Sequence, residues 1–190
     1  MDRRVKYSLR VLNESLVEKL KTKPIARITV KELCEAADVN RSTYYRHFLD
    51  PYDQLEKLFL QFVDDLVEYI VSAEGIDDIW GEGSFRTVER LCEYIYEHRE
   101  LYLVLSGAIG RTRYDELVRE KVMPHVFETL FRQGIRFNEK EAPFVFEYLS
   151  GGCNNILNYW LRESGGSFSP AEISDMLHRF NAGGLERYSS

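Results

Sequence analysis

The stretch that most constrains this chain is residues 29–48, TVKELCEAADVNRSTYYRHF, because it predicts two short helices joined by a tight turn. Thr29 and Glu32 have the spacing of a capping box, which starts the first of these helices. Asp38-Val39-Asn40 predicts the turn, since Asp adopts left-handed backbone more readily than most residues. The second helix is expected at about 41–47, with Asn40 as its side-chain cap.

This second helix is short, polar and basic. A helix of this kind, fixed at an angle to another helix, suits insertion into a DNA major groove. The side chains there that can donate hydrogen bonds to phosphates or base edges are Arg41, Ser42, Thr43, Tyr45, Arg46 and His47. A solvated surface position is the simpler interpretation of any one of them, whereas the ordered set on one helix favours DNA contact.

Charge is unevenly distributed along the chain, whose net charge is −6. The first 50 residues hold 11 Lys and Arg against 7 Asp and Glu, a balance of +4, and the other 140 hold 14 against 24, a balance of −10. A basic N-terminal part can bind DNA although the acidic remainder would repel it. Chance clustering of surface charge is the alternative, so charge alone does not decide the question.

Helical spacing dominates the whole sequence, and strand signals are few. We expect an all-α fold of about nine helices, with a three-helix helix-turn-helix head and a larger C-terminal helical bundle. Residues 1–50 would form the DNA-binding domain, a helix at 51–73 would connect, and 74–190 would form the ligand-binding and dimerisation domain. The remaining helices are expected at about 5–21, 84–98, 100–108, 111–133 (kinked at Pro124), 139–163 and 170–181.

Several classes of protein find no support in the sequence. No apolar run is long enough to cross a bilayer and the N-terminus lacks the apolar core of a secretory signal, so we expect a cytoplasmic protein with no membrane partner. The three cysteines are widely spaced, which argues against a disulfide framework and a zinc site. The four histidines lie far apart and no nucleophile or phosphate-loop motif occurs, so we expect no enzyme, cofactor or metal.

Two parts of the sequence resemble a known family. The run ITVKELCEAADVNRSTYYRHF followed by DPYDQLEKLF resembles the DNA-binding segment of TetR-family repressors, over about residues 8–60. EHRELYLVLSG and GGCNNILNYWLRESGGSFSP are similar to the C-terminal domain of a subset of that family, which includes regulators related to the activator of dihydroxyacetone kinase operons. The resemblance implies a ligand cavity in the body and a dimer formed by the last two helices.

The resemblance also implies roles for single residues. Thr29 would touch a phosphate with its hydroxyl or backbone amide. Arg41 and Ser42, at the exposed start of the second helix, would reach base edges. Thr43 and Tyr45 would meet phosphates or the edge of the groove.

Arg46 and His47 would face DNA late in the helix, while Tyr44 and Phe48 would pack inward. The chain departs from the family at Pro51, where a Lys often meets a backbone phosphate. Free amides at the start of the following helix would still offer a phosphate site.

The predicted body is rich in aromatic residues, and most of them are expected to fill its core. Where the resemblance implies a ligand cavity, we expect its lining among Trp80, Tyr94, His98, Tyr102, Phe127, Cys153 and Asn154.

The segment 144–161 is apolar around much of its circumference, yet carries Gly151-Gly152 in mid-helix. Each such glycine costs about 1 kcal/mol relative to Ala, and small residues let a second helix approach closely. We therefore favour a homodimer in which helix 139–163 packs on its copy and 170–181 completes a four-helix interface. A buried intramolecular helix is the alternative. A dimer would match a two-fold double-stranded DNA operator.

The sequence thus predicts a sequence-specific DNA-binding transcriptional regulator that acts as a homodimer. A ligand-responsive repressor, rather than an activator, follows from the resemblance alone. A small-molecule effector in the body would change the separation of the two heads and so the affinity for DNA. Two alternatives stay open: a helical interaction module or co-regulator whose body binds a protein partner, and an enzyme with an aromatic cavity.

Overall fold

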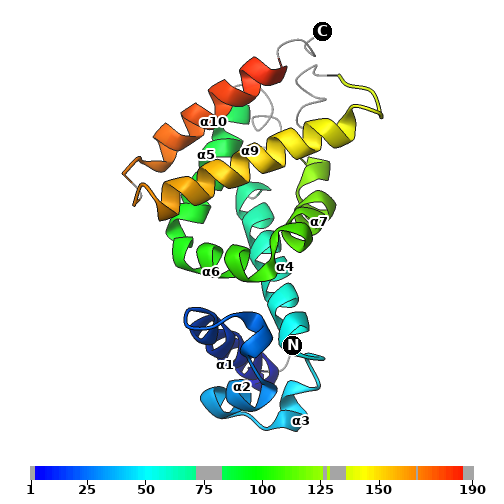
Figure 1. The fold of residues 1–190 in the computed structure, drawn as a ribbon, viewed down its shortest axis with the longest axis vertical. Helices are drawn as coiled ribbons and strands as arrows, with labels where there is room; N and C mark the ends of the chain where they lie inside the picture. The colour runs from blue at the N-terminus through cyan, green and yellow to red at the C-terminus, as the bar shows by residue number, and fades with distance from the viewer. Residues whose placement is uncertain (1–2, 72–82, 126–127, 129–135, 166, 186–190) are drawn as a thin grey trace. The chain divides into compact units, whose positions relative to one another are not determined.

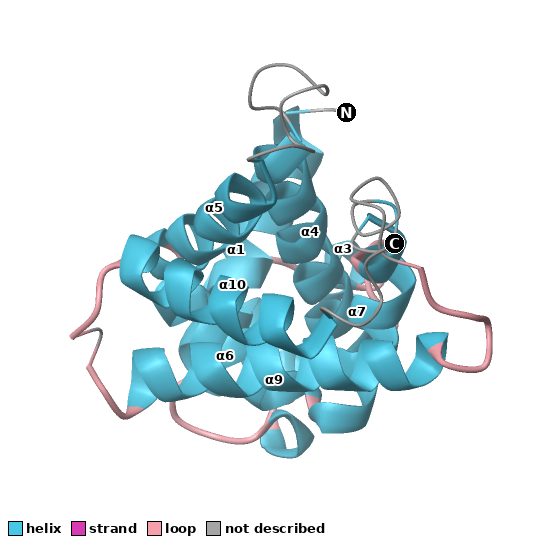
Figure 2. Cartoon of the chain, turned by 90° about the horizontal axis from the view of Figure 1, so that it is seen from above, coloured by secondary structure: helices cyan, strands magenta, loops and turns pink. Residues whose placement is uncertain are grey.

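The computed structural model describes residues 3–71, 83–125, 128, 136–165 and 167–185 (Figure 1). Figure 2 shows helices joined by loops and turns, with no strand among the described residues. The all-α class expected from the sequence is therefore confirmed. By packing, the chain divides into two compact units, Met1–Phe62 with Glu100–Arg113, and Val63–Arg99 with Tyr114–Ser190.

The first unit is built on the apolar stripe of the first helix, whose Leu12 and Leu16 are fully buried. These leucines lie four residues apart and so share one face of the helix. The elements of this unit are α1 (Arg3–Leu20), a 3₁₀ turn (Ile25–Arg27), α2 (Val30–Ala37), α3 (Arg41–Tyr44), the first part of α4 (Pro51–Val71) and most of α6 (Arg99–Ile109).

The second unit has its own core, in which Trp160 and Leu177 are almost completely buried. The elements of this unit are the end of α4, α5 (Gly83–Glu97), most of α7 (Arg111–Lys121), α9 (Ala142–Arg162) and α10 (Pro170–Leu185). Helices α5 and α10 pack along each other. The indole of Trp160 stacks on Tyr96 with ring centroids 5.4 Å apart and donates to the carbonyl of Phe168 at 2.9 Å, so a buried polar group is satisfied.

The start of α4 connects most of the first unit through side chains close together in sequence. Gln54 donates to the carbonyl of Leu12 in α1 at 2.8 Å. Glu56 accepts two hydrogen bonds from Arg113, at the start of α7. The contact with Glu56 joins Arg113 to the first unit, to which residues 100–113 belong by packing. The functional division between a DNA-binding domain and a ligand-binding domain stays a prediction.

Two expected details of the helices are wrong. Helix α3 ends at Tyr44, and turns replace a helix over residues 45–47. Asn40 makes no side-chain cap, because its own carbonyl accepts the amide of Thr43 at 2.9 Å, the amide that a cap would have taken.

The helix expected at 111–133 also differs from its prediction. Helix α7 ends at Lys121 and a turn at Val122 precedes a helical segment at 123–125. The break agrees with Pro124, whose ring clashes with the carbonyl four residues earlier. Residues 126–127 and 129–133 lie outside the described residues.

Candidate nucleic-acid interface

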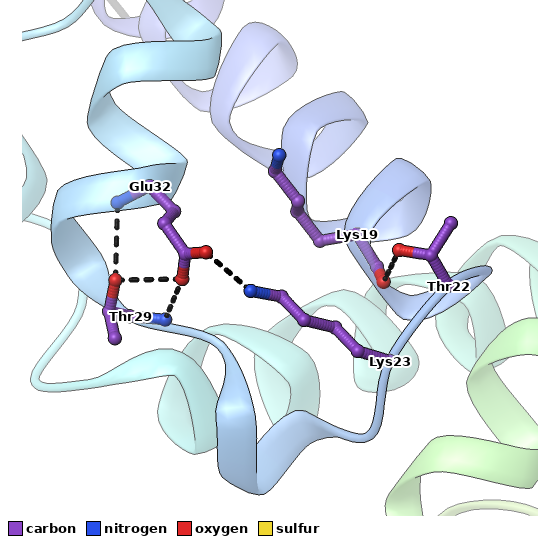
Figure 3. A network of polar contacts seen from close by, with 5 residues as sticks. All are labelled: Lys19, Thr22, Lys23, Thr29 and Glu32. Carbon is purple, nitrogen blue, oxygen red and sulfur yellow. Dashed lines mark hydrogen bonds and ion pairs between the residues drawn. The ribbon is translucent and has the colours of Figure 1, made fainter.

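Helix α2 begins at the capping box that the sequence predicted (Figure 3). The hydroxyl of Thr29 accepts the amide of Glu32 at 3.3 Å, while the amide and the hydroxyl of Thr29 both donate to Glu32 Oε2, at 3.0 and 2.8 Å. Lys23 donates to the other oxygen, Oε1. Hydrogen bonds from Lys23 and from Thr29 lower the pKa of Glu32 to about 2. The carboxylate thus joins the loop after α1 to the start of α2.

This arrangement occupies both groups of Thr29 that the sequence assigned to a phosphate. In the free protein they donate to a carboxylate, which carries negative charge where a phosphate would lie. Among the described residues, the amides of Val30 and Lys31 are the remaining donors of the first turn of α2. These two amides are therefore better placed to receive a phosphate than Thr29 itself.

The turn between α2 and α3 depends on Asp38, which has left-handed backbone with φ 51° and ψ 47°. The amides of Asp38 and Val39 both donate to the carbonyl of Cys34. Glycine is the usual residue at such a helix end, and Asp tolerates it at lower cost than most other residues. The predicted role of Asp38 is confirmed.

Residues 41–48, here called the recognition segment, have an inward and an outward side. Tyr44 is fully buried and Phe48 nearly so, which confirms their predicted packing role. Their rings lie 5.4 Å apart between centroids. The side chains predicted to contact DNA are on the outward side: Arg41, Ser42, Tyr45 and Arg46 are exposed, and Thr43 and His47 are half-buried.

The outward side of this segment is basic, and few acidic side chains pair with its positive charges. Within the described part of the chain, Arg41 and Arg46 of this segment have no carboxylate partner, and neither has Arg27, which precedes α2. Arg46 donates to the hydroxyl of Thr43 at 3.1 Å, a weak constraint that leaves its charge available. Unpaired guanidinium groups can bind phosphate or the edge of guanine in a bidentate manner.

The start of α4 is a poorer phosphate site than the sequence suggested. Pro51 has no amide hydrogen, and the amide of Asp53 already donates to Asp50 Oδ1 at 2.9 Å. The carboxylates of Asp50 and Asp53 also lie at this helix end, where they compete with a phosphate for the same positive potential. Tyr52, which is about half exposed, is the remaining polar side chain there.

Sequence reasoning missed two residues at this corner, Asp53 and Lys57. The ammonium of Lys57 donates to the carbonyl of His47 and to Asp53 Oδ2, both at 2.9 Å. The same carboxylate oxygen accepts the amide of Leu49 at 2.8 Å. The four-residue spacing of the two side chains was a visible signal for the ion pair. The contact with His47, ten positions earlier, had no such signal.

The residues expected to line a ligand cavity are distributed over both units. In the second unit, Tyr94 stacks on His98 with centroids 4.2 Å apart, and His98 Nδ1 lies 2.9 Å from the carbonyl of Tyr94. Cys153 Sγ accepts from Asn181 at 3.9 Å. Asn154 is buried and accepts from Asn158 through its backbone and side-chain oxygens.

Tyr102 lies instead in the first unit, where its ring is 6.3 Å from that of Phe62. Trp80 and Phe127 lie outside the described residues. In the part of the chain that the structure describes, no cluster of three or more potential ligands is placed to hold a metal ion. No described helix is long and apolar enough to span a membrane.

Comparison with known proteins decides the family. A model of the TetR group, described as a transcriptional regulator C-terminal region, matches residues 84–183. The chain belongs to the TetR family of transcriptional regulators. TetR proteins regulate transcription and are not enzymes, as the sequence led us to expect.

Individual proteins are also similar to this TetR-family chain. An uncharacterised HTH-type transcriptional regulator of Bacillus subtilis (strain 168), YxbF, is 24% identical over 167 residues, which are 87% of this chain and 42% of that protein. The chain thus spans about two-fifths of the length of this relative.

Among solved structures, the dihydroxyacetone kinase operon activator DhaS superposes with a TM-score of 0.57 at 15% identity, over 96% of this chain and 98% of the other. This likeness shows a shared fold, the one expected for the TetR subset.

Proposed function

We propose that the chain is a sequence-specific DNA-binding regulator whose recognition segment enters a DNA major groove. The observation that carries this proposal is the division of residues 41–48, in which Tyr44 and Phe48 are buried while the polar and basic side chains face outward. The buried side chains fix the position of the hydrogen-bond donors that face outward. The readout of DNA base edges requires donors in fixed positions. Membership of the TetR family supports the same conclusion.

Within this proposal each outward residue has a role. Arg41 and Ser42, at the first turn of α3, reach base edges. Thr43 and Tyr45 meet phosphates or the groove edge. Arg46 and His47 face DNA at the end of the segment.

At the start of α2, the amides of Val30 and Lys31 receive a phosphate. Thr29 contributes by holding this turn in place through Glu32. Each phosphate neutralised by a cation adds about 0.9 to the slope of log affinity against log salt concentration.

The proposal is tested by selecting duplexes from a random library with the purified chain and footprinting the selected sequence. We expect two half-sites about one helical turn apart and affinity that falls steeply with salt. Arg41→Ala should relax the preference at one base pair of each half-site. Lys140→Ala, which removes an exposed cation of the second unit, should leave binding unchanged. A library without enrichment, bound with a flat response to salt, rules out the function.

We propose further that the regulator is a homodimer formed through α9 and α10. Helix α9 exposes Phe144, Tyr148 and Tyr159 at spacings that place them on one face. A Cβ added at Gly152, on the same face, would meet nothing within 4 Å. No neighbour among the residues that the structure describes therefore requires a glycine there. Exposed aromatic side chains gathered on one face of a helix favour a second copy as its partner over solvent.

Tyr148 also joins the two helices of this face, since its hydroxyl donates to the carbonyl of Phe180 in α10 at 3.2 Å. The exposed ring of Phe180 extends the aromatic surface onto α10. The two helices together form the surface that a two-fold axis would double.

An effector site in the second unit completes the proposal. Tyr94 and His98 offer a stacked aromatic pair, and Cys153 and Asn154 offer polar atoms on α9. A small molecule bound there would change the affinity for DNA if it binds more tightly to the dimer at one separation of the two heads than at another. The test repeats the DNA titration with added metabolite fractions. Release from the operator would support a repressor, and tighter binding an activator.

The alternative of a protein-interaction module draws on one observation, the 78% exposure of Leu49 beside the recognition segment. Tyr45 and Tyr52, within four positions of Leu49 in the sequence, are exposed too, and aromatic side chains are enriched in protein contacts. The two functions differ in their response to Arg46→Ala. Loss of operator binding in that variant favours DNA, whereas a partner captured through Leu49 with no operator bound favours the module.

A further inference from the structure

The recognition segment is too short to be stable as a helix by itself. Helix α3 has 4 residues, far below the length at which an isolated helix is stable in water. Its conformation is imposed by its surroundings. Tyr44 and Phe48 fix its inner side and the turn at Asp38 fixes its beginning. Its end, residues 45–48, is held by hydrogen-bonded turns and by side chains of α4.

Lys57 is the side chain of α4 that reaches this end. Its ammonium donates to the carbonyl of His47 at 2.9 Å and lies 5.7 Å from the centre of the Phe48 ring. His47 is a proposed DNA contact and Phe48 its buried neighbour. Lys57 therefore contacts the segment on both its polar and its aromatic side.

Asp53 joins this contact to the start of α4. One oxygen, Oδ2, accepts both the ammonium of Lys57 at 2.9 Å and the amide of Leu49 at 2.8 Å. Burial opposes ionisation of Asp53, but the hydrogen bonds from Lys57 and from Leu49 outweigh it and hold the pKa of this carboxyl below its usual value. The carbonyl of residue 47 and the amide of residue 49 are thus bound to one ion pair.

This ion pair is partly open to water, with 51% of the Lys57 side chain and 23% of the Asp53 side chain exposed. Ion pairs of this kind contribute little to overall stability. The bonds to the main chain of residues 47 and 49 instead fix where the recognition segment ends. Their consequence should therefore be seen in DNA affinity more than in the melting temperature.

We propose that Lys57 and Asp53 are positioning residues for DNA recognition, which clamp the end of the recognition segment onto α4. This inference rests on the proposed DNA-binding function. The clamp keeps His47 and the preceding outward side chains in the arrangement that the groove requires, so that ordering them costs no affinity on binding. It also makes the segment and α4 move as one piece.

A competing role for Lys57 is direct contact with a phosphate, in place of the Lys absent at Pro51. The two roles differ in salt dependence. A phosphate contact that is lost flattens the plot of log affinity against log salt by about one unit. A lost clamp lowers affinity by the same factor at every salt concentration, because no contact between a cation and a phosphate is lost with it.

The experiment compares Lys57→Met, Asp53→Ala and the double variant with the wild-type chain on its selected operator, over a range of salt. Met keeps the apolar stem of Lys57 and removes the charge. We expect each single variant to bind about tenfold more weakly, the equivalent of one charge-assisted hydrogen bond, with an unchanged slope. The double variant should lose no more than either single variant, because both break one clamp.

Lys21→Met is the matched control, since Lys21 also pairs with a carboxylate in the first unit, Glu18, at 2.7 Å. It should bind DNA like the wild type. A flatter slope for Lys57→Met, additive losses in the double variant, or an equal loss for Lys21→Met would each overturn the proposal.

A second measurement needs no DNA and separates this inference from the proposed function. Backbone ¹⁵N relaxation of residues 45–49 should show lower order in Lys57→Met and unchanged order in Lys21→Met. Unchanged order in both would overturn the clamp even where the operator is bound. A chain that binds no duplex, yet loses order at 45–49 in Lys57→Met, would refute DNA binding and keep the clamp.

Discussion

The side-chain amide of Gln54 donates to the main-chain carbonyl of Leu12 at 2.8 Å and so joins α4 to α1. Gln54 is fully buried. Gln54→Ala should lower the free energy of unfolding by about 2–3 kcal/mol, because it leaves a cavity and removes this hydrogen bond. Urea denaturation followed by circular dichroism measures the loss. The matched control is Gln61→Ala, an exposed glutamine of the same helix, which should change stability by less than about 0.5 kcal/mol.

At the buried phenol of Tyr44 we expect a substitution to raise the free energy of unfolding rather than lower it. Its hydroxyl has no hydrogen-bond partner among the described residues, and burial raises its pKa. Tyr44→Phe should therefore raise the free energy of unfolding, by up to about 1 kcal/mol, and leave operator affinity unchanged. Tyr45→Phe, at an exposed position, should leave the free energy of unfolding unchanged and weaken operator binding. A clear loss of stability in Tyr44→Phe would mean that the hydroxyl has a partner such as a bound water.

Acid titration should distinguish the capping box at Thr29 from the one at Ser169. The pKa of Glu32 is lowered to about 2, whereas unfolded Glu titrates near 4.3. A lowered pKa means that the stabilising contribution of Glu32 is complete above about pH 4.3 and is lost as the pH falls toward 2. Carboxyl ¹³C shifts measure this directly.

Glu172 provides the internal reference for that titration. The amide and hydroxyl of Ser169 lower its pKa in the same way, but no Lys adds to them. Glu32 should thus titrate below Glu172, and Lys23→Met should raise its pKa toward that of Glu172. An unchanged pKa of Glu32 in this variant would contradict the ion pair with Lys23.

Substitutions at Gly152 test the proposed dimer. Because the monomer has open space there, Gly152→Ala should favour the helix by about 1 kcal/mol in a monomer. Gly152→Leu should weaken the dimer by about 1–3 kcal/mol, since the larger side chain separates the two copies of α9. Sedimentation over a range of protein concentrations measures both. Equal self-association of the Leu variant and the wild type would exclude close approach at this residue.

Structural features that depend on a few neighbouring residues were predicted correctly from the sequence. The capping box at Thr29, the left-handed backbone of Asp38, and the start of α4 after Asp50 all involve partners within five positions. At this range the residue types and their spacing determine the hydrogen bonds. The inward packing of Tyr44 and Phe48 was instead expected from the resemblance to TetR-family repressors.

What the sequence could not provide depends on contacts between distant residues. The bonds from Gln54 to Leu12 and from Lys57 to His47 join side chains to backbone atoms, and a backbone atom has no signature in the sequence. Arg113 contacts Glu56 of the first unit, 57 positions earlier in the sequence. The prediction of a side-chain cap at Asn40 was wrong for a different reason. The carbonyl and the side chain of Asn40 compete for the amide of Thr43, and the carbonyl accepts it.

The inward and outward sides of the recognition segment have a consequence for how regulators of this kind diversify. The residues that keep the segment folded, Tyr44 and Phe48, are not those that would meet a base pair. Arg41, Ser42 and Arg46 can therefore be exchanged with little effect on the amount of folded protein. After a gene duplication, a copy could acquire a new operator through substitutions at the surface while its inherited scaffold stays intact.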